Sequence, residues 1–366
     1  MNTFPRVMAC TIALSAVFCT FAVPVNADPL TLRDAITATL QHNPELAGYK
    51  FREQALQGER QTAALKPQLH ASSQLENVAG SNTYQGVESG ELTLSLSSVI
   101  ELGGQREARL DLVTARQQQL EATQRVLTLD VLSRLTRQFI AVSAQQEQLV
   151  LLQQTQGLVQ NNVNTLSKQV QAARTPEAEL LRANAAIAKA RIDVQKAEQL
   201  LKSEQVKLSA FWADTTPDFA QVKADLFALP VSAPLPDLLA RVENNPDLAL
   251  LGSEVLLRTG QLRQAQAERK PNLEWNTGIR RLQATDDSAL VVGVSMPLGS
   301  SKRASGAVTT AMANHASAEQ QRDTTRLQLK AQLLSLHQEY QQARGEVEAL
   351  QSDVIPPLKK ALRATE

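Results

Sequence analysis

Apolar residues recur at alternating spacings of three and four positions along two neighbouring stretches of the chain. The first stretch belongs to residues 105–175, a segment without proline that is rich in Leu, Ala, Gln, Arg and Glu. These residues lose little conformational freedom in a helix, so we expect one helix about 100 Å long. From Leu149 onward the predicted coiled-coil seam, with Gln156 as a polar intruder, comprises Leu149, Leu152, Val159, Val163, Leu166, Val170 and Ala173.

The second stretch follows Pro176 and carries a more regular seam. Its members, with Glu204 as the one violation, are Leu180, Ala183, Ile187, Ala190, Val194, Ala197, Leu201, Leu208 and Phe211. Because only the short link Ala173–Pro176 separates the two helices, we predict an antiparallel coiled-coil hairpin. Helices this long need partners of similar length, which favours an extended architecture; an ordinary helical bundle is the alternative.

Two pairs of short segments instead alternate with a period of two, namely residues 68–78 with 91–100 and residues 272–282 with 289–297. In the second of these segments Leu92, Leu94 and Leu96 share one face, and Thr93, Ser95 and Ser97 share the other. Segments of about ten residues with this pattern are typical of transmembrane barrel strands, although a soluble amphipathic hairpin has the same pattern.

A pore is the expected environment of the small polar face. We predict that Thr93, Ser95 and Ser97 face it, together with Asn276 and Gly278 from the second strand pair. Tyr84 and Trp275 are candidates for the headgroup level of the membrane, where aromatic side chains are favoured; packing within a loop or a strand is the equal alternative.

The chain also contains a tandem repeat in which helix, strand pair and long helix occur twice. Three paired segments carry it: Asn43-Pro44 with Asn245-Pro246, Lys66-Pro67 with Lys270-Pro271, and Leu102-Gly103 with Leu298-Gly299. The expected divisions are a first repeat over residues 28–211, a proline-rich connector over 212–236 and a second repeat over 237–366, whose long helix covers 301–355. The second repeat lacks a returning helix before Glu366, so we expect a fragment or a truncated gene.

Four strands cannot close a barrel, and open strand edges are not viable in lipid. If these segments are membrane strands, several chains must therefore share one barrel. Two chains would give about eight strands and three would give about twelve.

Composition and the N-terminus narrow the location of the protein. Lys plus Arg (37) balance Asp plus Glu (37), so charge provides no argument for binding nucleic acid. Residues 1–27 have the features of a secretory signal, with cleavage near Ala27. Cys10 and Cys19 both lie within this segment, so the mature chain is expected to have no thiol and no disulfide.

Catalytic and ligand-binding patterns are not found in the sequence. His42, His70, His315 and His337 lack metal-ligand spacing, and Gly103-Gly104 lacks the lysine and spacing of a phosphate-binding loop. No serine or cysteine nucleophile motif is visible. We therefore predict a protein that is not an enzyme and that binds no cofactor or metal as a resident group.

The repeat motifs resemble those of TolC-family outer membrane efflux factors from Leu30 onward. The strand-to-helix turns carry much of this resemblance, and they comprise Glu101, Leu102, Gly103 and Gly104 in the first repeat and Leu298 and Gly299 in the second. Together with Arg106, Arg109 and the Arg174-Thr175-Pro176 tip, the first turn is most similar to the heavy-metal, CzcC-like branch.

The resemblance implies a mainly α-helical trimer in which a shared barrel of twelve strands, four per chain, continues into a TolC-like helical tunnel. It also implies an outer membrane location with a periplasmic tunnel, and partners that comprise outer membrane lipid, a periplasmic adaptor and an inner-membrane pump of the resistance-nodulation-division type. The substrates would be divalent cations of the cobalt, zinc and cadmium type. Drugs or other small molecules are the alternative substrates.

The hairpin tip is the expected adaptor contact. Turn residues leave backbone groups open to a partner, and the expected contacts are Ala173, Arg174, Thr175, Pro176 and Leu180. Two other classes of protein share part of the pattern: a periplasmic adaptor carries one coiled-coil hairpin, and a secreted coiled-coil scaffold carries heptads and a signal. The two helical repeats, each with its own strand pair, favour the duct.

Overall fold

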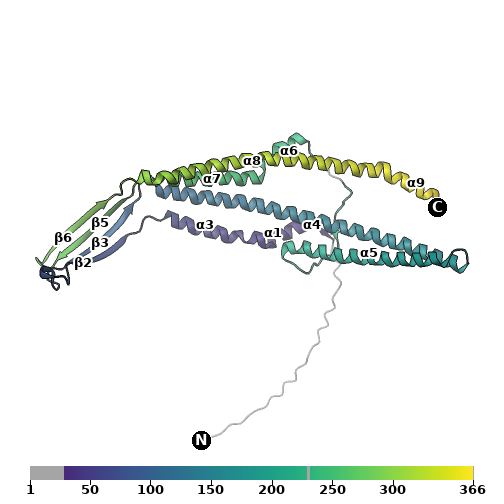
Figure 1. Cartoon of the computed structure of the whole chain (residues 1–366), viewed down its shortest axis with the longest axis horizontal. Helices are drawn as coiled ribbons and strands as arrows, with labels where there is room; N and C mark the ends of the chain where they lie inside the picture. The colour runs from purple at the N-terminus through teal and green to yellow at the C-terminus, as the bar shows by residue number, and fades with distance from the viewer. Residues whose placement is uncertain (1–28, 229–230, 366) are drawn as a thin grey trace, which may run out of the picture.

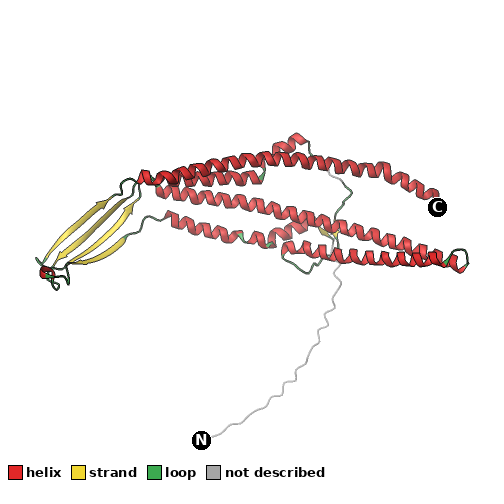
Figure 2. Ribbon diagram, viewed as in Figure 1, coloured by secondary structure: helices red, strands yellow, loops and turns green. Residues whose placement is uncertain are grey.

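The computed structural model describes residues 29–228 and 231–365, so the predicted signal segment 1–27 lies outside the described residues. The chain is extended, with a sheet at one end and a long helical hairpin reaching toward the other (Figure 1). Its principal strands lie apart from the helices at a single end of the molecule (Figure 2). The extended architecture expected from the helix lengths is therefore observed.

The first repeat begins with short elements and continues into a very long helix. Its elements are β1 (Leu30–Thr31), α1 (Leu32–His42), α2 (Pro44–Ala47), α3 (Tyr49–Ala64), β2 (His70–Glu76), η1 (Asn82–Tyr84), β3 (Glu91–Ile100), α4 (Gln105–Gln171), α5 (Glu177–Ser209) and η2 (Ala210–Trp212). Helix α4 is 67 residues long, and Asn43 caps α2 by accepting hydrogen bonds from the amides of Glu45 and Leu46.

The second repeat follows a connector that contains β4 (Val222–Lys223). Its elements are α6 (Leu235–Arg241), η3 (Val242–Asn244), α7 (Pro246–Ala267), β5 (Leu273–Leu282), β6 (Asp287–Ser295), α8 (Ser300–Ala349), the π-helical turn η4 (Leu350–Val354) and α9 (Ile355–Thr365). The helical path thus continues past residue 355, where we expected it to end. The wider π turn precedes Pro356 and Pro357, which lack amide hydrogens, and accommodates them without a break.

The α4–α5 hairpin has the predicted seam. Seam residues are buried or half-buried, such as Val163 and Leu166 in α4 and Ala183, Ile187 and Val194 in α5, while most of their sequence neighbours are exposed. At the seam violation, the Glu204 carboxylate accepts hydrogen bonds from Lys207 Nζ (2.8 Å) and Gln138 Nε2 (2.6 Å). These two contacts, that of Lys207 foremost, lower the pKa of Glu204.

Ala173 is the exception to the predicted seam. Helix α4 ends at Gln171, and Ala173 is exposed in the turn with a left-handed φ of 49°. Its amide donates to the Val170 carbonyl at 2.9 Å, which closes the end of the helix. The predicted seam was therefore wrong at this residue, because the chain leaves the helix before the next core position.

Strands β2, β3, β5 and β6 form one antiparallel sheet in that order. The register places Leu94 beside Ser73 on β2 and beside Ile279 on β5, and places Ile279 beside Leu290 on β6. The two predicted strand pairs, one from each repeat, therefore join through β3 and β5. Strand β2 is shorter than predicted, and β6 covers Asp287–Ser295 rather than 289–297.

A small core near the middle of the helices was not anticipated. Strand β1 pairs in parallel with β4 from the connector, and the buried residues there are Ala35, Leu135, Phe139, Val142, Leu208, Phe219 and Val222. The side-chain amide of Gln146 accepts from the Val222 amide (2.8 Å) and donates to the Val222 carbonyl (3.3 Å). The connector is thereby held against the hairpin rather than hanging free between the repeats.

Helix α4 lies between α3 and α7 in the half of the molecule next to the sheet. Leu112 on α4 packs against Leu257, and Gly260 on α7 lets the two backbones approach, since an added Cβ would lie 3.3 Å from Leu112 Cα. Arg263 on α7 pairs with Asp111 at 3.1 Å. The two repeats are therefore joined through α4 and α7 as well as through β3 and β5.

Gly278 is expected to be essential for the central strand pairing. An added Cβ would lie 2.5 Å from the Leu94 carbonyl oxygen and 2.7 Å from Ser95 Cβ, so neither β3 nor β5 has room for it. Gly278→Ala should destabilise the folded protein by about 1–3 kcal/mol, the usual cost of overpacking. The measurement is the thermal loss of the β signal in detergent by circular dichroism.

Gly157→Ala is the matched control, because Gly157 lies in α4 with nothing within 4 Å of an added Cβ. It should leave the melting temperature unchanged or raise it slightly, since Ala is the better helix former. Equal melting temperatures for the two variants would contradict the assigned role of Gly278.

Candidate functional site

One face of the sheet is apolar and open. Its side chains, identified from the pairing register, include Ala71, Leu75, Leu92, Leu94, Leu96, Ile100, Leu273, Trp275, Ile279, Leu290, Val292 and Val294. Leu290, Val292 and Val294 are between 65% and 74% exposed. An apolar surface of this kind is rarely left in contact with water, so it is suited to contact with lipid or another apolar phase.

The opposite face is small and polar along its centre. Thr93, Ser95 and Ser97, the predicted pore residues, all project to this side, and Asn276 and Gly278 lie beside Ser97 and Ser95. Ser95 and Ser72 share a hydrogen bond of 2.7 Å between their hydroxyl oxygens. Trp275 belongs to the apolar face near the helices, whereas Tyr84 lies in the loop at the other end, so the two aromatic residues mark opposite ends of the sheet.

An arginine is held among carboxylates on this polar face, near the loops. Arg280 donates to Thr93 Oγ1 through Nε (3.1 Å) and to Glu91 Oε2 (3.1 Å), and it lies 3.7 Å from a carboxylate oxygen of Glu76. Sequence reasoning missed this cluster. Arg280 lies 187 positions from Thr93 and 189 from Glu91 in the sequence, and the β3–β5 register brings them together, while the β2–β3 register adds Glu76.

Carboxylates exceed cations on the polar face. Glu76, Glu91, Glu274 and Asp287 lie there, and Arg280 is the one Arg or Lys on that side of the described strands. Glu274 accepts a hydrogen bond from the Ser295 hydroxyl at 3.2 Å, a neutral partner that leaves its charge in place. The face therefore has an electrostatic preference for cations.

The first strand-to-helix turn is built from the predicted motif. Gly103 and Gly104 have φ values of 89° and 71°, which glycine adopts without strain. Glu101 forms a two-point ion pair with Arg109 at 2.5 and 3.0 Å, and this contact raises the pKa of Arg109. Arg106 Nε donates to the Ala64 carbonyl (2.8 Å), which satisfies a free carbonyl at the end of α3.

This first turn packs against the second repeat. An added Cβ at Gly103 would lie 3.0 Å from both the Ala267 carbonyl oxygen and the Lys270 side chain, and Gln105 Nε2 donates to the Lys270 carbonyl at 3.5 Å. The second turn lacks such a neighbour in the described chain: Gly299 has open space around it, and Leu298 is 83% exposed. The first turn buries its surface against the end of α7. The corresponding surface of the second turn is exposed in the described chain.

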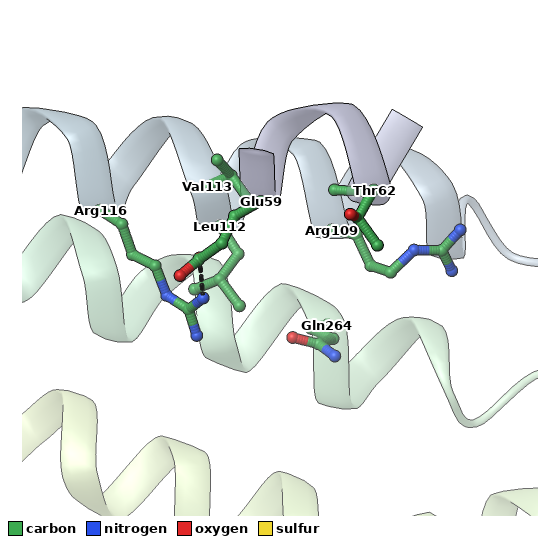
Figure 3. A pocket seen from close by; sticks show the side chains of 8 residues that line it. Glu59, Thr62, Arg109, Leu112, Val113, Arg116 and Gln264 are labelled. Atoms are coloured by element: carbon green, nitrogen blue, oxygen red, sulfur yellow. Dashed lines mark hydrogen bonds and ion pairs between the residues drawn. The ribbon is translucent and has the colours of Figure 1, made fainter. Parts of the chain in front are cut away.

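A hollow between α3, α4 and α7 is lined by Glu59, Thr62, Ala63, Arg109, Leu112, Val113, Arg116 and Gln264. In Figure 3 Arg116 reaches Glu59, with which it forms an ion pair of 2.6 Å. Within residues 29–228 and 231–365 no group of three or more His, Cys, Asp or Glu side chains is arranged to hold a metal ion.

The hairpin tip presents polar turn residues at the end far from the sheet. The Arg174 amide donates to the Gln169 carbonyl (2.8 Å), and Thr175 Oγ1 donates to Gln169 Oε1 (3.1 Å). The Arg174 side chain is exposed. Leu180 is half-buried in the seam with α4, whereas its neighbour Leu181 is 62% exposed.

Across the described residues, no helix combines the length and the apolar character that a membrane-crossing helix requires.

The comparisons with known proteins agree on one family. Residues 35–214 match the family described as outer membrane efflux protein. The cobalt-zinc-cadmium resistance protein CzcC of Cupriavidus metallidurans is 24% identical over 339 residues, which are 92% of this chain and 79% of CzcC.

Solved structures share the fold. The outer membrane protein VceC from Vibrio cholerae superposes with a TM-score of 0.71 at 17% identity, covering 91% of this chain and 84% of VceC. The corresponding values for CusC are a TM-score of 0.68, 15% identity and coverage of 91% and 81%. With its TolC-like fold and its match to the outer membrane efflux protein family over residues 35–214, the chain is similar to the non-enzymatic outer membrane channels of tripartite efflux pumps.

Proposed function

We propose that three copies of this chain form a passive export duct, with one barrel of twelve strands in the outer membrane and a helical tunnel in the periplasm. The observation that supports this most directly is the open sheet, which has one apolar face, one polar face and two free edges. In hydrocarbon every backbone polar group needs a partner within the protein, so the edges β2 and β6 must meet strands of other copies. Residues 1–27 would direct export and be removed near Ala27.

The internal repeat predicts how the edges meet. Gly299 lies 196 positions after Gly103, and Pro271 lies 204 positions after Pro67, so β6 corresponds to β3 and β2 corresponds to β5. Applying the β3–β5 register to β6 and to β2 of the next copy places Val294 beside Ala71 and Leu290 beside Leu75. Both pairs fall on the apolar face, so the shared barrel keeps one apolar outside and one polar inside.

The helices support the same assembly. Helix α4 lies between α3 and α7 of its own chain, but α8 has no buried residue within the described chain. By the repeat, α8 would lie between α7 of its own chain and α3 of the next copy. That position would also cover Leu298 and the second strand-to-helix turn.

The predicted register can be tested with cysteine pairs. Val291 and Gln74 fall opposite each other on the polar face, and directly paired residues have Cβ atoms about 4.5–5.5 Å apart. We expect V291C/Q74C to crosslink to a closed trimer on oxidation or with a short thiol reagent, as seen on a denaturing gel. Both native cysteines lie in residues 1–27, so the processed chain has no competing thiol.

V291C/L75C is the control, because a slip of one residue places the two side chains on opposite faces of the sheet. It should give little crosslinked product. Efficient crosslinking of the slipped pair, or closure at two copies, would overturn the proposed barrel.

We infer that the cargo is divalent heavy-metal cations of the cobalt, zinc and cadmium type, with drugs or other small molecules as the alternative. The similarity to CzcC and the acidic polar face support this choice. A duct needs no tight metal site, because ions must leave as readily as they enter. The energy for export would come from a resistance-nodulation-division pump in the inner membrane, not from this chain.

The acidic face predicts cation preference in planar bilayers. The channel should conduct K⁺ in preference to Cl⁻, as measured by the reversal potential in a salt gradient. Glu274→Gln with Asp287→Asn, which removes two carboxylates per copy without breaking an ion pair, should reduce the permeability ratio about twofold or more. Asp218→Asn, in the connector and away from the sheet, should leave it unchanged. An anion-selective parent channel, or an unchanged ratio in the double variant, would refute this role of the polar face.

The hairpin tip is our proposed contact for a periplasmic adaptor. Ala173, Arg174, Thr175 and Pro176 form the turn at the end of the molecule that would reach furthest into the periplasm (Figure 1). Leu180 supports the tip through the seam, and Leu181 offers an exposed apolar neighbour. The polar turn and the exposed leucine together suit a protein partner.

Crosslinking in cells that contain the adaptor checks this assignment. A photoreactive reagent attached to cysteine at Arg174 or Thr175 should capture the adaptor, whereas the same reagent at Lys189, exposed further along α5, should capture much less. Stronger capture from position 189 than from the tip would place the docking site elsewhere.

A further inference from the structure

Exposed cations gather where the strands meet the helices. We call this set the junction belt; its members are Lys66, Arg106, Arg269, Lys270, Lys302 and Arg303. The four junction segments, residues 64–70, 101–109, 266–272 and 297–304, contain seven Lys or Arg and three Glu, a formal charge of +4 in a chain whose net charge is zero. One of those glutamates, Glu101, is already paired with Arg109.

The other end of the sheet has the opposite charge. Residues 76–91 and 280–287 contain five Asp or Glu and two Arg, a formal charge of −3. Both arginines have acidic partners there, since Arg280 contacts Glu91 and Arg281 contacts Asp286. The sheet is therefore basic at its helix end and acidic at its loop end.

The cations of the junction belt form no ion pair with a carboxylate in the described chain. Lys66, Lys270, Lys302 and Arg303 have no side-chain hydrogen bond or ion pair with any residue of the described ranges. Arg106 uses its Nε on the Ala64 carbonyl, and Arg269 makes a 3.4 Å contact with the Ser301 hydroxyl, so neither arginine is neutralised by a carboxylate. These cations are available to an external anion.

Exposed leucines lie among these cations. Leu65 and Leu69 are 65% and 63% exposed and flank Lys66 in sequence. The apolar face of the sheet ends here too, at the row of Ile100 and Leu273. Strand β3 is 10 residues long, which is the usual length of a tilted transmembrane strand. The cations of the junction belt lie just beyond this end of the apolar face.

We propose that the junction belt binds the phosphate groups of anionic phospholipids in the inner leaflet of the outer membrane. The inference rests on the proposed function, which places the sheet in the membrane and the helices in the periplasm. Lysine and arginine are attracted to anionic headgroups, and the neighbouring leucines enter the boundary of the acyl chains. The loop end of the sheet is acidic and would repel anionic headgroups, so these lipids are not expected to bind there.

The test uses the full processed chain as a detergent-solubilised trimer. Phosphatidylglycerol, supplied in mixed micelles, should raise the melting temperature more than phosphatidylcholine does, and native mass spectrometry should detect retained phosphatidylglycerol. The variant with Lys66, Lys270, Lys302 and Arg303 all changed to Gln should lose that difference and retain about threefold less anionic lipid. Lys189→Gln with Lys196→Gln, two exposed cations on α5, should behave as the parent protein.

Two further experiments distinguish lipid binding from a folding defect and from the binding of soluble anions. Lys66→Arg, Lys270→Arg and Lys302→Arg together keep the charge and should keep the lipid preference, which excludes a mere folding defect in the glutamine variant. Inorganic phosphate alone should not raise the melting temperature; an equal shift would indicate a site for soluble anions and overturn the proposal. The proposal would also be overturned if phosphatidylglycerol and phosphatidylcholine changed the melting temperature of the parent protein equally.

The results distinguish a failure of the lipid-binding proposal from a failure of the proposed duct. If the trimer forms and conducts but shows no lipid preference, the junction belt is not a lipid site and the duct remains. If no trimer forms, both proposals fall together.

Discussion

The backbone of two edge strands controls the organisation of this protein. In hydrocarbon an unpaired amide or carbonyl has no water to replace its missing partner, so β2 and β6 cannot remain edges there. The apolar and polar faces of the sheet make sense only if pairing continues around a closed ring. Small residues such as Gly278 and Ser95 then let neighbouring strands approach on the inner side, where the ring is most crowded.

The tandem repeat supplies the means of closing that ring. Within one chain the first strand-to-helix turn packs on the end of α7, held by Gly103 and Gln105, and α4 packs on α7 through Leu112 and Gly260. The second repeat offers the same kind of surface with no counterpart in the described chain. Contacts inside the protomer therefore serve as a template for contacts between protomers, and a chain of two similar halves needs only one type of interface.

Much of this architecture follows from local patterns. The hairpin seam follows from apolar spacing, and the two faces of β3 follow from alternation, because each depends on residues close in sequence. Details that depend on distant residues did not follow. The Arg280 cluster requires the β3–β5 register, the β1–β4 pair requires the connector to fold back, and Ala173 leaves the seam because the helix ends two residues earlier.

The exposure of helix α8 affects the stability of a newly exported chain before it assembles. It has no buried side chain in the described protomer, so its 50 residues gain little from tertiary packing until a neighbour arrives. A copy without neighbours would fray along this helix and be open to proteolysis, while an assembled copy would be protected. Surplus subunits could then be cleared by the same property that makes assembly favourable, and the supply of finished ducts would follow the concentration of chains steeply rather than in proportion.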